Sequence, residues 1–102
     1  MSLKKQFLKS RSVCKVTFRL PREIVSHANS VALVGDFNGW SEGACWMNKL
    51  KSGEYTCLLE LAKGRSYQFR YLIDGKKWIN DPEADDYVKN AFGSQNSVAE
   101  IR

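Results

Sequence analysis

Three segments of the chain alternate between apolar and polar residues, which is the pattern of a half-buried β-strand. They are Val13–Leu20, Tyr55–Leu61 and Tyr67–Ile73. Pro21 follows the first segment directly and ends its pairing, because proline has no backbone N–H to donate. These segments predict three strands that each place one face against a core.

A different pattern occurs at Val31–Trp40, which reads VALVGDFNGW. Its first four residues are all apolar, and a short apolar run that ends at a glycine predicts a buried strand. Asn38-Gly39 is a strong turn dipeptide, and Trp40 lies just past it. Two interpretations remain open: the turn presents Trp40 as an aromatic binding platform, or Trp40 folds back onto the core.

The remaining segments are shorter and less regular. Asp74-Gly75 predicts a hairpin, with a short returning strand beginning at Lys76, Lys77 and Trp78, and Ser97–Ile101 predicts a last strand. Three further segments have no clear strand pattern: Arg22–Ser30, a loop with room for one helical turn; Ser41–Leu50, in which Trp46 and Leu50 could close a core edge; and Asp81–Gln95, a long loop. The pattern predicts an all-β, immunoglobulin-like β-sandwich of the early set type, with six to eight short antiparallel strands.

Length and charge refine this picture. A chain of 102 residues predicts one domain with a small core. We expect the domain over residues 13–102, preceded at residues 1–12 by a basic, flexible arm that contains Lys4, Lys5, Lys9 and Arg11. The net charge of +5 predicts mild attraction to anions, and it does not by itself indicate nucleic acid.

The cysteine content bears on metal binding and on the compartment. Cys14, Cys45 and Cys57 are an odd number without C-x-x-C spacing, and His27 is the sole histidine, so no zinc pattern is present. We expect three reduced thiols and a cytoplasmic location. The sequence shows neither a signal peptide nor an apolar run long enough for a membrane span.

Catalysis has little support in the sequence. The carboxylates that a hydrolytic pair would need lie together in one loop, as Asp81, Glu83, Asp85 and Asp86, and a solvated acidic turn explains them more simply. The same cluster lacks the EF-hand spacing for calcium. No nucleophile elbow, P-loop, dinucleotide fingerprint or RNP pattern is present. We therefore expect no enzyme, no cofactor, no metal and no nucleic acid.

Sugar binding suits the residue types better. The apolar CH face of a sugar ring packs on an indole, and its hydroxyl groups need donors and acceptors at fixed positions. Trp40, Trp78 and Asn96 each follow a predicted turn. If the sandwich brings them together, they form a shallow saccharide site.

Four motifs carry a resemblance that covers about residues 13–101. They are GDFNGW at 35–40, YQFRYLIDGKKW at 67–78, NDP at 80–82 and FGSQNSV at 92–98. In this order they resemble the glycogen-binding carbohydrate modules of family 48. Such modules occur in the β subunit of AMP-activated protein kinase and as the N-terminal early set domain of isoamylase.

The resemblance implies a set of carbohydrate-binding residues: Trp40, Arg70, Trp78, Phe92, Ser94 and Asn96. Arg70 stands where the family has lysine, Phe92 where leucine is usual, and Ser94 where threonine is common. Phe92 could add a stacking face or block the site. Lys77 is one extra residue before Trp78, so the orientation of that tryptophan is open.

The resemblance implies a non-catalytic module for α-1,4-linked glucans such as glycogen, starch or maltooligosaccharides. It could tether a protein partner, either a glucan-active enzyme or a kinase-like complex, to glucan. The alternative is a protein-interaction module that keeps the fold and has lost sugar binding. The sequence does not determine the oligomeric state.

Overall fold

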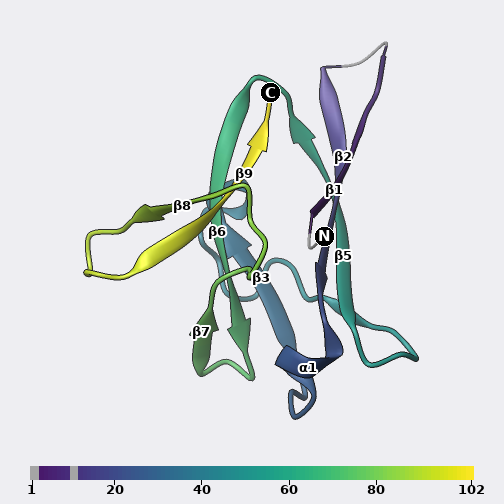
Figure 1. Ribbon diagram of the computed structural model, residues 1–102, viewed down its shortest axis with the longest axis vertical. Coiled ribbons are helices and arrows are strands. Elements are labelled where there is room, and N and C mark those ends of the chain that lie inside the picture. The colour runs from purple at the N-terminus through teal and green to yellow at the C-terminus, as the bar shows by residue number, and fades with distance from the viewer. Residues whose placement is uncertain (1–2, 10–11) are drawn as a thin grey trace.

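Two antiparallel β-sheets pack face to face in the computed structural model, which describes residues 3–9 and 12–102 (Figure 1). This confirms the predicted all-β sandwich. Of the residues predicted to form the N-terminal arm, Met1, Ser2, Ser10 and Arg11 lie outside the described part of the chain. In that part, no helix is long and apolar enough to cross a bilayer.

The first sheet has the strand order β1-β2-β5-β4, and the second has the order β3-β6-β9-β8 with β7 also paired to β6. The first sheet consists of β1 (Leu3–Phe7), β2 (Val13–Leu20), β5 (Tyr55–Ala62) and β4 (Asn48–Lys49). The second consists of β3 (Val31–Gly35), β6 (Arg65–Ile73), β9 (Gln95–Ile101), β8 (Asp86–Lys89) and β7 (Lys77–Ile79). Two short helical turns, α1 (Arg22–Val25) and η1 (Asp36–Asn38), connect the sheets.

The three alternating segments form β2, β5 and β6, and their apolar faces meet between the sheets. Phe18 of β2 and Phe69 of β6 are fully buried, and their rings meet edge to face with centroids 5.1 Å apart. Tyr71 adds a second edge-to-face contact to Phe69, at 5.6 Å. Such aromatic pairs stabilise the core beyond the area that they bury.

The described residues form nine strands rather than six to eight, and one of the added strands corrects the prediction of a flexible arm. Residues Leu3–Phe7 form β1, which pairs with β2 from Leu3↔Phe18 to Phe7↔Cys14. Leu3 is only 2% exposed. The lysines of this segment led us to expect a solvated terminus, yet Leu3, Lys5 and Phe7 lie on one face of the strand, and that face is apolar except for Lys5.

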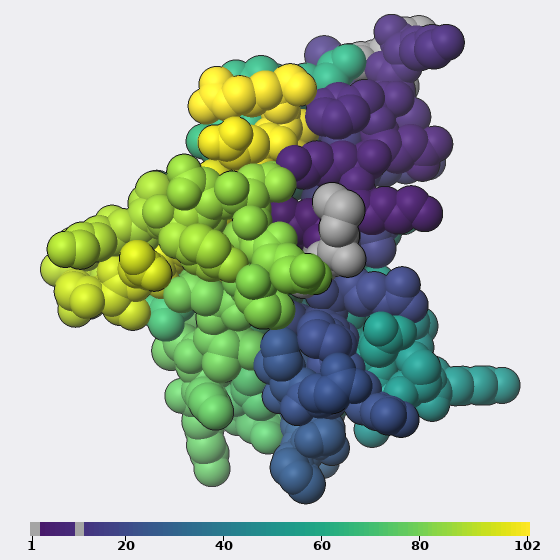
Figure 2. Space-filling view, viewed as in Figure 1, coloured from purple at the N-terminus to yellow at the C-terminus, as the bar shows by residue number. Residues whose placement is uncertain are grey.

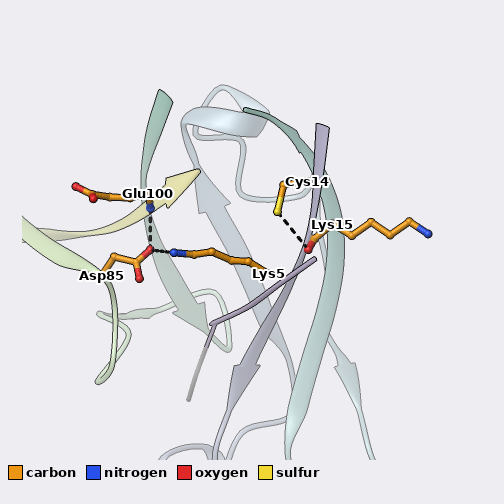
Figure 3. A network of polar contacts seen from close by, with 5 residues as sticks. All are labelled: Lys5, Cys14, Lys15, Asp85 and Glu100. Atoms are coloured by element: carbon orange, nitrogen blue, oxygen red, sulfur yellow. Dashed lines mark hydrogen bonds and ion pairs between the residues drawn. The ribbon is translucent and has the colours of Figure 1, made fainter. Parts of the chain in front are cut away.

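Lys5 joins the two sheets at this edge (Figure 3). Its Nζ lies 2.6 Å from Oδ2 of Asp85, and the same carboxylate oxygen accepts a hydrogen bond of 2.8 Å from the backbone N–H of Glu100 in β9. Both side chains of the ion pair are about a quarter exposed. A basic residue of the expected arm therefore has a structural partner.

We expect the substitution Leu3→Ala to lower the free energy of unfolding by about 2–4 kcal/mol, because it removes a buried leucine from the core. Lys4→Ala is the matched control, since Lys4 is exposed on the same strand and its loss should change stability by less than about 0.5 kcal/mol. Urea denaturation of both variants measures the difference. Equal stabilities would mean that residues 3–7 do not pack in solution.

Two other predicted segments also differ from the structure. The segment Asp81–Gln95 contains strand β8, which pairs with β9, so it is not one continuous loop. Trp46 does not close a core edge, because 56% of it is exposed and the next residue, Met47, is buried instead. Met47 occupies the inner side because the backbone at 45–47 pairs with β3 and alternates with it.

All three cysteines are free thiols in the structure. Cys14 is fully buried, and Cys45 is half-buried with its Sγ 2.9 Å from Sγ of Cys57. Burial is the main reason why the pKa of Cys57 rises to about 12, and the hydrogen bond and charge of Cys45 raise it further. Cys57 is therefore a thiol, not a thiolate, at neutral pH.

We expect Cys45 to react first with a thiol reagent in the native protein at pH 8. A pKa near 12 leaves only about one Cys57 in ten thousand as the reactive thiolate, and Cys14 is inaccessible. Protein prepared without oxygen should show one fast thiol before denaturation and three after it, with the fast phase absent in Cys45→Ser. Three equally fast thiols would contradict this arrangement.

Candidate functional site

The segment GDFNGW at 35–40 builds the first wall of the candidate site on the outer face of the second sheet. Asn38 closes its turn with both ends of its amide: Oδ1 accepts from the Gly35 N–H at 3.1 Å, and Nδ2 donates to the Leu33 carbonyl at 2.9 Å. Gly35 is needed for close packing, because an added Cβ would lie 2.5 Å from the Gln68 carbonyl oxygen. Phe37 points inward and packs on the core.

Trp40 at the end of this turn is held in an uncommon conformation. Its φ of 60° lies in the left-handed region, which is costly for a bulky residue. Its indole N–H donates to Oδ1 of Asp36 at 2.9 Å, and Oδ2 of the same carboxylate accepts from the Gln68 N–H at 2.8 Å. Asp36 therefore fixes the ring relative to β6. Backbone strain of this kind is common at binding sites.

Trp78 lies on the same outer face. It pairs with Leu72 of β6, and Leu72 pairs with Ala32 of β3, so the three side chains share one face of the sheet. Trp40 and Trp78 both pack against an outer apolar cluster of Ala32, Val34 and Leu72. Both rings are half-buried. Trp40 therefore combines the two initial interpretations. Like Trp78, it packs on an apolar cluster, and part of its ring stays exposed to a ligand.

The extra residue Lys77 does not turn Trp78 away from this face. The register pairs Ile73 with Lys77, so Asp74, Gly75 and Lys76 form a three-residue loop. Asp74 and Gly75 both have positive φ angles, of 53° and 67°. The loop absorbs the added length.

Arg70 lies beside Trp78 at a junction in the sheet. Strands β9 and β7 pair in turn with the same edge of β6, β9 with Arg65–Phe69 and β7 with Tyr71–Ile73. Arg70 is the residue between these two ranges. Its guanidinium lies 5.7 Å from the centroid of the Trp78 ring, within the range of a cation–π contact. Among the described residues, its buried Nε has no hydrogen-bond partner, and the side chain lines the cavity described below.

The β8–β9 hairpin forms the opposite wall and projects beyond the body of the molecule (Figures 1 and 2). Asn90 shapes its turn, because Oδ1 accepts from the backbone N–H groups of Phe92 at 2.9 Å and Ser94 at 3.1 Å. Phe92 at the tip is 92% exposed. It therefore does not fill the site, which leaves its ring free to contact a ligand.

Asn96 is 8% exposed and belongs to strand β9, so it is not a turn residue. Its Nδ2 donates to Oε1 of Gln68 at 3.0 Å, and its Oδ1 accepts from Nδ2 of Asn90 at 3.2 Å. These two partners fix the amide plane. An amide oxygen has two lone pairs, so Oδ1 keeps one acceptor position.

These walls border an open cavity of about 440 Å³, within the usual range for small-ligand sites. Its lining residues are Trp40, Arg70, Trp78, Asn90, Phe92 and Asn96. Five of the six residues that the sequence predicted therefore lie around one cavity. Ser94 does not line it, and lies exposed in the hairpin turn. Asn90 was missed, although asparagine before a glycine-containing turn is a typical turn-forming signal.

A family model described as the glycogen recognition site of AMP-activated protein kinase matches residues 16–102. The chain belongs to this family. It matches no curated protein. The glycogen-recognition family consists of carbohydrate-binding modules, which are normally non-catalytic. The match begins inside β2, so β1 lies outside the part that the family model covers.

The acidic loop has structural roles in this member of the glycogen-recognition family. Asp81 is fully buried and accepts from the hydroxyl of Tyr71 at 2.7 Å. Asp85 binds Lys5, as described above, and Asp86 accepts from the N–H of Tyr87. Among residues 3–9 and 12–102, no group of three or more His, Cys, Asp or Glu side chains is arranged to hold a metal ion.

Proposed function

We propose that the protein is a non-catalytic module that binds α-1,4-linked glucan in the cavity between Trp40 and Trp78. The observation that carries the proposal is that two half-buried indoles and the guanidinium of Arg70 line one cavity. Indole faces suit the CH face of glucose, and the Arg70 N–H and the Asn96 oxygen suit its hydroxyl groups. Membership of the glycogen-recognition family supports the same ligand class.

The cavity offers few groups that could perform chemistry on a glucan. Glycoside hydrolysis needs two carboxylates on either side of the scissile bond. The residues that line the cavity carry none. We therefore propose that any effect on glucan metabolism comes from a protein partner that the module brings to glucan, such as a glucan-active enzyme or a kinase-like complex. A reducing compartment such as the cytoplasm suits its free thiols.

Retention on insoluble amylose, with glycogen and maltoheptaose as soluble competitors, tests the proposal. Cellulose and cellohexaose are the matched controls, because they contain the same sugar in β-1,4 linkage. We expect retention on amylose, release by the α-glucans and no response to the β-glucans. Folded protein that binds none of these ligands, or that binds both linkages equally, would overturn the proposal.

A protein-interaction role is the second candidate function, and the exposure of Phe92 favours it. A phenylalanine that is 92% exposed at the tip of a projecting hairpin is available to an apolar partner surface. This candidate would gain support if folded protein failed to bind amylose while Phe92→Ala weakened the capture of a partner. In that case the protein would have kept the fold and the cavity but would have lost sugar binding.

A further inference from the structure

Trp46 is a large exposed aromatic residue that neither the cavity nor the family resemblance uses. It is 56% exposed, and it lies in the connection between η1 and β4, outside the residues that line the cavity. An exposed tryptophan next to a binding site is a candidate for an additional ligand contact. Where its side chain points decides whether it belongs to the same surface.

The backbone pairing places Trp46 on the outer face of the second sheet. It forms an antiparallel bridge with Ala32 of β3, flanked by hydrogen bonds from Leu33 N to Cys45 O at 2.9 Å and from Met47 N to Val31 O at 2.8 Å. This is a non-hydrogen-bonded pair, in which the two side chains are close together on one face of the sheet. Ala32 belongs to the outer apolar cluster beneath Trp40 and Trp78.

Trp46 therefore completes a row across four segments. The register links Trp46 to Ala32, Ala32 to Leu72, and Leu72 to Trp78. Neighbouring strands lie roughly 4.8 Å apart, so the two ends of the row are separated by about 14 Å. That span exceeds a single sugar ring, and a ligand that touches both ends must be an oligosaccharide. Trp40 packs on the same cluster, so the whole row belongs to one continuous face.

We propose that Trp46 provides a further stacking subsite, which makes the module selective for longer α-glucan chains. A short ligand occupies only the cavity at Trp78, Arg70 and Asn96. A longer chain continues past the tryptophans that cover the outer apolar cluster and packs a sugar ring on the indole of Trp46. This inference rests on the proposed function, because it assumes that the cavity binds α-glucan.

The test compares the affinity of wild type and Trp46→Ala for maltotriose and for maltoheptaose by isothermal titration calorimetry. We expect the affinity for maltotriose to change by less than about twofold, and the affinity for maltoheptaose to fall about tenfold, as loss of one stacking contact predicts. Leu58→Ala is the matched control: Leu58 is 59% exposed on β5 of the other sheet, and its loss should change neither affinity.

The outcomes separate this inference from the proposed function. If wild type binds neither oligosaccharide, the proposed function fails, and the inference fails with it. If wild type binds both and Trp46→Ala has the same affinities as wild type, only the inference fails. Equal losses for both ligands would also overturn it, because Trp46 would then act on the cavity as a whole. Trp46→Phe keeps an aromatic ring, and we expect it to restore part of the preference for the longer chain.

Discussion

Replacing Asp81 with alanine should lower the free energy of unfolding by about 3–4 kcal/mol, a large share of the roughly 5–15 kcal/mol that stabilises a small domain. Asp81 is fully buried at the start of the segment that leads to the β8–β9 hairpin. Its carboxylate accepts from the Tyr71 hydroxyl at 2.7 Å and from the Glu83 N–H at 2.8 Å. Alanine accepts neither hydrogen bond, so the buried Tyr71 hydroxyl loses its partner.

A double-mutant cycle separates this contact from a general loss of packing. Tyr71→Phe alone should cost about 2 kcal/mol, because it removes a hydrogen bond to a charged group. The double variant Asp81→Ala/Tyr71→Phe should cost at least about 1 kcal/mol less than the sum of the single changes, since it leaves no unpaired hydroxyl. Additive costs would mean that the two side chains are not coupled. Asp86→Ala, at an exposed carboxylate of the same segment, is the control.

Alkaline pH gives the same contact a second test. Burial raises the pKa of Tyr71 well above its ordinary value of 10.0, and the nearby charge of Asp81 raises it further. Above pH 10 the unfolded chain loses the phenolic proton while the folded protein keeps it. The stabilisation is therefore complete below pH 10 and is lost as the pH rises above it. We expect this loss in wild type and a smaller one in Tyr71→Phe.

The alternation of apolar and polar residues predicted the strands that bury one face against the core. Strands that lack this alternation were missed. Segments β2, β5 and β6 have clear apolar faces, and each matched a strand. Strand β1 was missed because its inner face contains Lys5, whose charge is neutralised by Asp85, 80 residues away in the sequence. Strand β8 has only four residues and follows the acidic residues around Pro82. Long-range pairing, not local preference, forms both strands.

The sequence predicted the site residues that follow a recognisable turn or match a motif of the family. It predicted less well the residues whose position depends on how the strands pair. Trp40 and Trp78 follow sequence-evident turns, and both line the cavity. The position of Arg70 depends on β7 and β9 sharing one edge of β6, which no local pattern reveals. Likewise, the alternation of 45–47 with β3 gives Trp46 its outward direction. Both depend on contacts between segments far apart in the sequence.

Trp78→Ala is expected to weaken binding to maltoheptaose at least thirtyfold, because loss of a central aromatic contact in a binding site costs about 2 kcal/mol or more. Trp78 is a better position than Trp40 for this test, because Trp40 has a positive φ angle and its substitution would also change the backbone strain. Trp78 also supports Arg70, whose guanidinium lies 5.7 Å from its ring. Removal of the indole therefore takes away a stacking face for the ligand, and it also removes the ring that contacts the Arg70 guanidinium.

The stability of the same variant decides between a binding and a core role for Trp78. A tryptophan buried in the core would cost about 3–5 kcal/mol when replaced by alanine. Trp78 is half-buried and covers only the outer cluster around Leu72, so we expect a smaller loss, of about 1–2 kcal/mol. Trp78→Phe should keep most of this cover and recover part of the affinity. If Trp78→Ala loses core-like stability, yet the fraction that remains folded binds maltoheptaose as tightly as wild type does, Trp78 belongs to the core and the site lies elsewhere.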